Sequence, residues 1–350
     1  MNSKKLIHWL EELSAKDGFL VGNKCANLGE MIQLGMRVPP GFAISANGYN
    51  EFAESTGTNQ KILDYIESRG KIEGIEKLDE ASRAIRAMIE DKKIPDDLKG
   101  EIVSAYEALC DKMGTADAPV AVRSSGLAED SAGASFAGQF ESYLNVKGEK
   151  ELLKQVKTVW SSAFTARAIS YRARKGLAIE GDSIGVAVLA MVNARASGIS
   201  FTVDPVTGDP TKIIIEANWG LGEGVVSGAE SVDGFVIDKE KLEVITSHVG
   251  KKTRCVMNME QGAEWADVPK NMQGIACIGK EEIEEIARVA KSIEKSLGCP
   301  QDMEWAIDQN LPFPESVFFL QTRPATAQVK KPESTTDKMI DLMAKRFFRP

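Results

Sequence analysis

The residues best suited to chemistry lie in the run VAVRSSGLAEDSAGASFAGQFESYLNV, at residues 120–146. Its apolar start predicts a buried strand that delivers Arg123, and small residues dominate the segment 131–138 that follows. Arginine supplies planar charged donors, and the backbone amides of a small-residue loop can approach phosphate oxygens closely. The run therefore favours binding of a polyphosphate, with an ion pair from Arg123 to Glu129 or Asp130 as the alternative.

Hydrophobic periodicity indicates which elements must position this run. The helices expected in the first half lie at 24–35, between 47 and 112, and, as one long amphipathic helix, at 150–175. From Ser183 the pattern changes to short β-branched strands separated by Gly, Pro and Asp. The last expected elements are a helix at 280–297 and a hairpin formed by 302–308 and 316–322. These patterns predict an α+β fold with two lobes that meet near residue 190.

Composition excludes several classes of protein. The chain has 350 residues, 43% of them hydrophobic, which is enough for two or three subdomains with proper cores. A net charge of −8 argues against nonspecific nucleic-acid binding as the main role. The five cysteines have no CxxC spacing and no nearby histidine, which favours free thiols in a reducing cytoplasm. Without a signal peptide or a long apolar run, we expect a cytoplasmic protein with no membrane partner.

Further motifs occur in a fixed order along the chain. They are GNKCANLGEM and VPPGFAISANGY near the start, SGISFTVDPVTGD and ANWGLGEGVVSGAESVDGFVI in the middle, and DMEWAID and LQTRPAT near the end. Together with the first run, they resemble the PEP/pyruvate-binding, ATP-binding module of phosphoenolpyruvate synthases, pyruvate phosphate dikinases and rifampicin phosphotransferases. The resemblance implies an ATP-grasp-like fold. Its N-terminal lobe would be 1–190, its C-terminal lobe 191–328, and 329–350 would be a tail or a partner-binding end.

The resemblance also implies a phosphate-binding role for four residues. Lys24 would contact the nucleotide phosphates, and Arg123 would act beside it as a catalytic residue. Gly138 and Ser142 match the phosphate loop of the family. Without the family pattern, a lysine at a helix start is usually a solvated surface charge, and a run of small residues is usually an ordinary loop.

The expected hairpin near the end carries the candidate metal site. Glu304 and Gln321 lie on its two strands and could bring a carboxylate and an amide oxygen to one Mg²⁺, in contact with ATP. Arg323 lies two residues past Gln321, on the same face of its strand, and would contact the transferring phosphate as a second catalytic residue. The alternative is an ion pair between Glu304 and Arg323 across the hairpin.

Two features bear on the nucleotide base. The family often has a glutamine near the adenine, in a run like VQxMV, and this chain has Leu189 at that place. Backbone atoms of residues 190–192 could still read the adenine edge, so the effect of Leu189 on selectivity stays open. The glycine-dense segment 220–233, which carries Glu223, is no dinucleotide fingerprint, because no βαβ unit surrounds it.

The phosphoryl carrier of the family is not found here. Family enzymes phosphorylate a histidine on a swivelling domain marked by a TxGGxxxH-type motif. Neither His8, expected on an N-terminal helix, nor His248, expected in a strand, has this context. We therefore predict one subunit of a split phosphotransferase, which transfers the pyrophosphoryl group of ATP to a histidine on a partner subunit and gives AMP and phosphate. The alternatives are a ligase that forms an acyl phosphate and releases ADP, and a non-catalytic nucleotide-sensing module.

Overall fold

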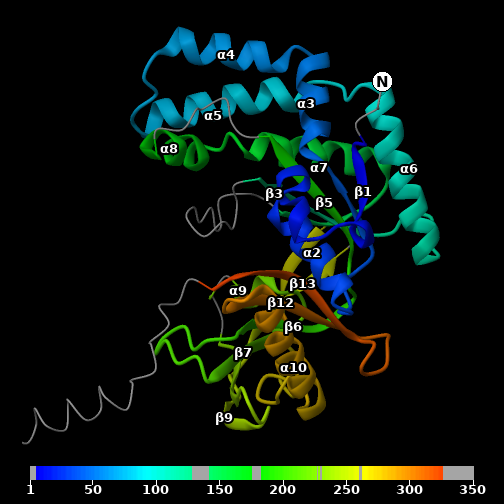
Figure 1. The fold of residues 1–350 in the computed structure, drawn as a ribbon, viewed down its shortest axis with the longest axis vertical. Coiled ribbons are helices and arrows are strands. Elements are labelled where there is room, and N and C mark those ends of the chain that lie inside the picture. Colours follow the sequence, from blue (N-terminus) through cyan, green and yellow to red (C-terminus); the bar gives the residue numbers. More distant parts are fainter. Residues whose placement is uncertain are drawn as a thin grey trace, which may run out of the picture.

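The computed structural model describes residues 5–127, 142–175, 183–226, 228, 231–259 and 262–325. Within these ranges the strands form two larger antiparallel sheets and one separate two-stranded hairpin. Figure 1 shows the first half of the chain in the upper part of the molecule and the second half in the lower part. The α+β class that the sequence predicts is confirmed.

The first sheet has the order β1-β2-β5-β3-β4. Its strands are β1 (Ile7–Trp9), β2 (Gly41–Ile44), β3 (Val120–Gly126), β4 (Ser142–Val146) and β5 (Ile184–Ala190). The helices of this half are η1 (Leu10–Glu12), η2 (Ala15–Asp17), α1 (Gly18–Val21), α2 (Asn23–Gln33), α3 (Ala46–Ser55), α4 (Thr58–Arg69), α5 (Ile75–Glu90), α6 (Asp96–Met113), α7 (Glu149–Ser162) and α8 (Ala166–Lys175).

One face of the first sheet is covered by helices. Val122 of β3 and Val188 of β5 are fully buried in one core with Trp160 of α7. Because side chains alternate along a strand, Ala121 and Arg123 point to the opposite face of β3. That face is turned toward the second half of the chain, and the candidate site forms there.

The second sheet has the order β13-β12-β6-β7-β8-β9. Its strands are β6 (Ala194–Phe201), β7 (Lys212–Trp219), β8 (Asp233–Asp238), β9 (Val244–His248), β12 (Gln301–Asp308) and β13 (Val317–Pro324). The helices of this half are α9 (Glu223–Val226) and α10 (Lys280–Leu297), and the separate hairpin consists of β10 (Arg254–Met259) and β11 (Gly262–Asp267). The expected pairing of the two last strands is confirmed, because β12 and β13 run antiparallel.

Alternation along β12 separates the core from the site. Met303 and Trp305 are fully buried on the face that shares a core with Ile286 of α10. Asp302 and Glu304 lie on the other face of the strand. The long helix α10 begins and ends where the sequence predicts, and the second sheet therefore has one apolar face and one face that carries acids.

Two expectations of secondary structure need correction, and one element was not expected. Residues 150–175 form two helices, α7 and α8, because Thr165 accepts a hydrogen bond from the Ala168 amide (3.2 Å) and so caps a new helix. His8 lies in the short strand β1, paired with Ala43, and not on a helix. The hairpin β10–β11 is an element that the sequence analysis does not identify.

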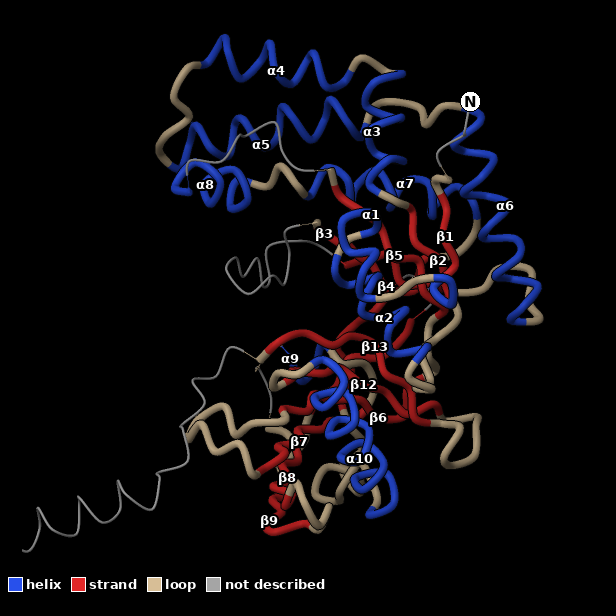
Figure 2. Tube along the Cα trace, in the orientation of Figure 1, coloured by secondary structure: helices blue, strands red, loops and turns tan. Residues whose placement is uncertain are grey.

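The two halves contact each other through α2 and β13. The Asn27 side chain of α2 donates a hydrogen bond to the carbonyl of Thr322 (3.0 Å). The Phe319 amide of β13 donates to the carbonyl of Arg37 (2.8 Å). Figure 2 shows α2 directly above β13, at the level where the two sheets meet. The lobe boundary near residue 190 stays a prediction, and the tail 329–350 lies outside the described residues.

None of the helices in the described ranges is both long and apolar enough to cross a membrane. Among the five cysteines, Cys299 is partly exposed and the other four are buried. All five are free thiols, as the spacing predicts.

Candidate functional site

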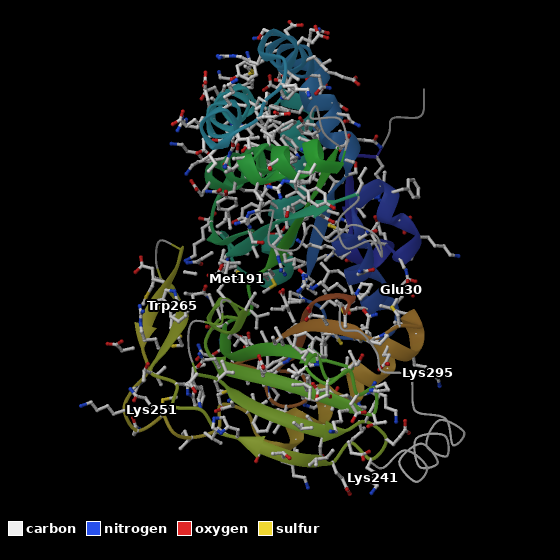
Figure 3. All side chains as sticks on the ribbon, turned by 90° about the vertical axis from the view of Figure 1, so that its left-hand side faces the viewer. Glu30, Met191, Lys241, Lys251, Trp265 and Lys295 are labelled. Atoms are coloured by element: carbon white, nitrogen blue, oxygen red, sulfur yellow. The ribbon has the colours of Figure 1, made fainter. Side chains whose placement is uncertain are left out.

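A cavity of about 490 Å³ lies between the two sheets, within the size range of small-molecule sites. The first half contributes Pro39, Ala121, Arg123, Ser142, Leu144, Leu189 and Ala190. The second half contributes Met191, Val192, Ala194, Ser197, Leu221, Gly222, Glu223, Val226, Trp265, Glu304, Ala306 and Leu320. In Figure 3, Met191 lies at the level where the two halves meet, and the hairpin that carries Trp265 stands on the same side of the molecule. Two halves around one cavity are the arrangement that an ATP-grasp-like fold requires.

Arg123 forms the charged end of this cavity together with two residues of the second sheet. Its guanidinium donates to Glu304 Oε2 (3.0 Å) and to Gln321 Oε1 (2.8 Å). A third hydrogen bond reaches the carbonyl of Leu320 (3.3 Å). Glu304 and Gln321 face each other across β12 and β13, beside a bulge between Glu304 and Trp305. The structure thus brings together three of the residues that the sequence analysis selects.

One alternative pairing considered from the sequence, Glu304 with Arg323, does not form, while the alternative partners of Arg123, Glu129 and Asp130, lie outside the described residues. Arg323 contacts Asp302 through its Nε (2.9 Å) and Nη2 (2.7 Å), and Glu304 pairs with Arg123. The alternative of an ion pair between Glu304 and Arg323 is therefore wrong. The reason is the register, which places Arg323 opposite Asp302 and Gln321 opposite Glu304.

Asp302 lies next to the candidate site residue Arg323 and was not selected from the sequence. Its side chain lies on the same face of β12 as Glu304, and it is directly paired with Arg323. The signal was present in the sequence, because two acids spaced two residues apart on a strand point the same way. The second sheet thus presents two carboxylates, Glu304, which is paired with Arg123 of the first sheet, and Asp302, which is paired with Arg323.

Lys24 lies at the start of α2, close to the end of β3. The Cys25 amide donates to Ser125 Oγ (3.1 Å), which ties the first turn of α2 to the strand that carries Arg123. Lys24 is one helical turn before Asn27, whose side chain contacts β13, so both residues lie on the same side of α2. Lys24 itself does not line the cavity within the described part of the chain. The helix start adds a positive partial charge and amide donors that favour anions.

The phosphate loop expected from the sequence is only partly described. Ser142 lies opposite Arg123 in the pairing of β3 with β4 and lines the cavity. Gly138 lies outside the described residues, as do Glu129 and Asp130.

Two further carboxyl groups lie on or near the acidic face. Burial raises the pKa of Glu223, and the nearby charge of Arg123 opposes this increase. Burial also raises the pKa of Glu216 of β7. Glu216 and Glu304 are both paired with Ile199 of β6, one from each side, so they belong to one row across the sheet. A cation at this face would oppose the raised pKa of Glu223 and of Glu216 and favour their charged forms.

The oxygen donors fit Mg²⁺ only in combination with phosphate oxygens. In the described ranges, no group of three or more His, Cys, Asp and Glu residues is close enough to hold a metal ion. Glu304 and Gln321 share one partner, Arg123, so a carboxylate and an amide oxygen do converge on one place. Mg²⁺ is commonly bound by one or two carboxylates together with substrate phosphates and water. Glu304 and Gln321 fit this pattern of ligands.

The other end of the cavity is apolar. Its walls include Leu144, Leu189, Met191, Leu221 and Ala306. The Ala190 amide donates to the carbonyl of Pro40 (2.8 Å), and the Met191 amide donates to that of Pro119 (2.9 Å). The amides of Ala190 and Met191 are therefore already used, and the expectation that backbone atoms of residues 190–192 read the adenine edge is left to the other backbone groups of these residues.

Neither histidine of the chain lines the described cavity. His8 lies in β1 and His248 in β9, which are edge strands of the two sheets. Burial lowers the pKa of His8, and its Nε2 lies 3.2 Å from the carbonyl oxygen of Lys5. The assignment of His248 to a strand is confirmed. An imidazole for phosphoryl transfer is therefore not supplied at the cavity by either residue.

Comparisons with known proteins agree on one family. The family described as "Pyruvate phosphate dikinase, AMP/ATP-binding domain" matches residues 19–343. A probable phosphoenolpyruvate synthase of Methanocaldococcus jannaschii is 39% identical over 98% of this chain, and a phosphoenolpyruvate synthase of Aeropyrum pernix is 38% identical over 96%. The chain spans only 28% and 44% of these two relatives. Biotin carboxylase from Campylobacter jejuni shares 14% identity over 89% of this chain and 40% of its own, with a TM-score of 0.30, which is too low to support a conclusion.

Proposed function

Because the chain belongs to the family of pyruvate phosphate dikinase AMP/ATP-binding domains, we propose that its cavity binds ATP in one orientation. The triphosphate lies at the charged end, near Arg123, Ser142 and the start of α2. The base lies at the apolar end, between Met191 and Leu221. The observation that carries this proposal is the position of Arg123, whose guanidinium meets Glu304 and Gln321 at one end of a cavity that is apolar at the other.

Arg123, which lines the cavity, and Arg323, which lies on β13 outside its lining, are each already balanced by a carboxylate. Arg123 contacts Glu304, and Arg323 contacts Asp302. Mg²⁺, when bound, would neutralise negative charge on the phosphate oxygens. Glu304, with Gln321, would hold it, and the two guanidinium groups would then turn from their carboxylates to phosphate oxygens. Such groups lower the barrier to phosphoryl transfer by stabilising charge that develops in the transition state.

Lys24 completes the charged end in this proposal. It lies on the first turn of α2, where the positive end of the helix dipole favours an anion. A compact ammonium suits non-bridging phosphate oxygens, while the two arginines can bind in a bidentate manner. The three cations come from three elements, α2, β3 and β13, so a triphosphate would bridge the two halves of the chain.

We propose that the acceptor of the phosphoryl group is a histidine on a partner subunit. The sequence has two histidines, and both lie on edge strands away from the cavity. The pyrophosphoryl group of ATP would pass to the partner's imidazole with release of AMP, and hydrolysis of the outer phosphate would leave a phosphohistidine and free phosphate. Phenylphosphate synthase is divided in this way, with phenol as the final acceptor, and we propose this chain as the ATP-binding subunit of such an enzyme.

The test is to identify where each phosphorus atom of ATP goes. The chain, Mg²⁺ and a candidate histidine-bearing partner are mixed with ATP labelled at the β or at the γ phosphorus, with phenol or pyruvate as final acceptor. We expect AMP as the nucleotide product, the β label on the partner protein, and the γ label in free phosphate. Product ADP would instead identify a ligase that forms an acyl phosphate. Binding of ATP without turnover with any partner would identify a nucleotide-sensing module.

A further inference from the structure

The hairpin β10–β11 connects the two halves along one side of the cavity. Its base is held by the second half, since the Leu221 amide donates to the carbonyl of Val256 (2.7 Å). Its far end is held by the first half, because the Asn145 side chain of β4 donates to the carbonyls of Met259 and Gly262. Asn145 is nearly buried and has a backbone φ of 57°, a conformation that asparagine tolerates better than most residues. The hairpin is therefore a wall of the cavity fastened at both ends.

Trp265 is placed on the inner side of this wall. It is paired with Val256, so both residues point to the same face of the hairpin. Val256 is buried in one cluster with Val192 and Leu221, which also line the cavity. Trp265 lines the cavity as well, but 36% of it remains exposed. A large indole therefore stands at the apolar end with part of its surface open to a ligand.

The indole is also held in place by a charge. The guanidinium carbon of Arg254 lies 5.1 Å from the centre of the Trp265 ring, close enough for a cation–π contact. Arg254 and Trp265 are diagonal neighbours on the hairpin, so this contact restricts how the ring can turn. A ring with a restricted orientation presents a flat apolar surface with little entropy left to lose on binding.

We propose that Trp265 stacks on the nucleobase and is the main determinant of base binding at this cavity. This inference rests on the proposed function, because it assigns the apolar end to the base of ATP. Leu189 offers no hydrogen bond, and the amides of Ala190 and Met191 are used within the protein. Stacking on an aromatic ring tolerates any base, because every base has a π-face. The cavity therefore binds ATP and GTP with dissociation constants within about ten-fold of each other.

The experiment measures dissociation constants by calorimetry, in Mg²⁺, for ATP, GTP and inorganic tripolyphosphate. The variants are Trp265→Ala, Trp265→Phe and a control, Glu264→Ala, which removes the exposed neighbour on the opposite face of β11. Trp265→Ala is expected to weaken ATP and GTP by about ten-fold or more, and to leave tripolyphosphate unchanged. Trp265→Phe should recover most of the affinity, and Glu264→Ala should bind like the natural protein.

A second readout uses the indole itself. The difference in fluorescence between the natural protein and Trp265→Phe reports this one ring among the five tryptophans. We expect ATP and GTP to quench that difference, and tripolyphosphate to leave it unchanged. Asn145→Gly keeps the left-handed backbone but releases the far end of the hairpin, and should speed the dissociation of ATP without changing that of tripolyphosphate.

The possible failures are distinguishable. If the natural protein binds ATP and Trp265→Ala binds it equally well, the role of Trp265 is refuted while the proposed function stands. Equal weakening of tripolyphosphate and ATP by Trp265→Ala would show a purely structural role and would also refute the inference. A preference for ATP over GTP of a hundred-fold or more would refute base-tolerant stacking. If the natural protein binds neither ATP nor tripolyphosphate, the proposed function and the inference both fail.

Discussion

Replacing Gly22 by alanine should disturb the contact that brings the start of α2 to the candidate site. Gly22 has φ 81° and ψ 156°, and a Cβ added there would lie 2.0 Å from the carbonyl oxygen of Ser125. Gly35, at the other end of α2, has φ 78°, and a Cβ added there would meet nothing within 4 Å among the described residues. Both alanine variants therefore replace a glycine with a positive φ next to one end of α2, and only the Cβ at Gly22 would clash with a neighbouring strand.

The expected size of each effect follows from these geometries. At Gly35 only the backbone conformation is unfavourable, which costs about 1–2 kcal/mol for an L-residue. At Gly22 the backbone region is used almost only by glycine and costs about 1–3 kcal/mol. The contact with Ser125 must also lengthen from 2.0 Å to an ordinary 3.4 Å, against backbone that no rotamer change can move. Overpacking of this kind costs about 1–3 kcal/mol, so Gly22→Ala should lose about 2–6 kcal/mol in total.

The measurement is the free energy of unfolding in guanidinium chloride for the natural protein, Gly22→Ala and Gly35→Ala. The affinity for tripolyphosphate in Mg²⁺ is measured in parallel. Gly22→Ala should also bind tripolyphosphate more weakly, because it displaces the helix start that carries Lys24, and Gly35→Ala should not. Equal losses of stability in the two variants would show that the approach of α2 to β3 is not tight, and would refute the reasoning.

Three further predictions concern individual charges. Arg323→Ala should reduce phosphoryl transfer by about 100-fold or more. It should cost only about 1 kcal/mol of stability, because the ion pair of Arg323 with Asp302 is partly exposed. Unchanged turnover would show that the phosphate lies elsewhere. Asp233→Ala leaves the fully buried Lys252 without its carboxylate partner. It should lower the free energy of unfolding, measured by denaturation, by about 3–5 kcal/mol. A loss below about 1 kcal/mol would contradict this prediction. Burial raises the pKa of Glu216, so just above the ordinary glutamate pKa the folded state binds more protons than the unfolded state. The free energy of unfolding should therefore fall as the pH rises through that range. Glu216→Gln should make this fall less steep, and a steeper fall in the variant would contradict the prediction.

The sequence alone was enough to predict the strands that carry Arg123 and Glu304, but not the hairpin β10–β11 that carries Trp265. The apolar start at Val120 predicts the strand that delivers Arg123, and the alternation in DMEWAID predicts a strand with Glu304 on one face. The helix at 280–297 is correct to the residue, because its apolar spacing and its terminal Gly298 are both local signals. Family motifs added roles for Lys24 and Ser142, and these roles stay predictions.

The tertiary structure decided which of these residues meet. Arg123 and Glu304 are 181 residues apart in the chain, and only the packing of one sheet on the other brings their side chains to 3.0 Å. In the same arrangement Arg323 pairs with Asp302, and Trp265 lines the cavity. Periodicity reports the face on which a side chain lies, because it reflects hydrogen bonds and burial within one element. The partner of that side chain depends on how distant elements pack, and no local pattern contains that information.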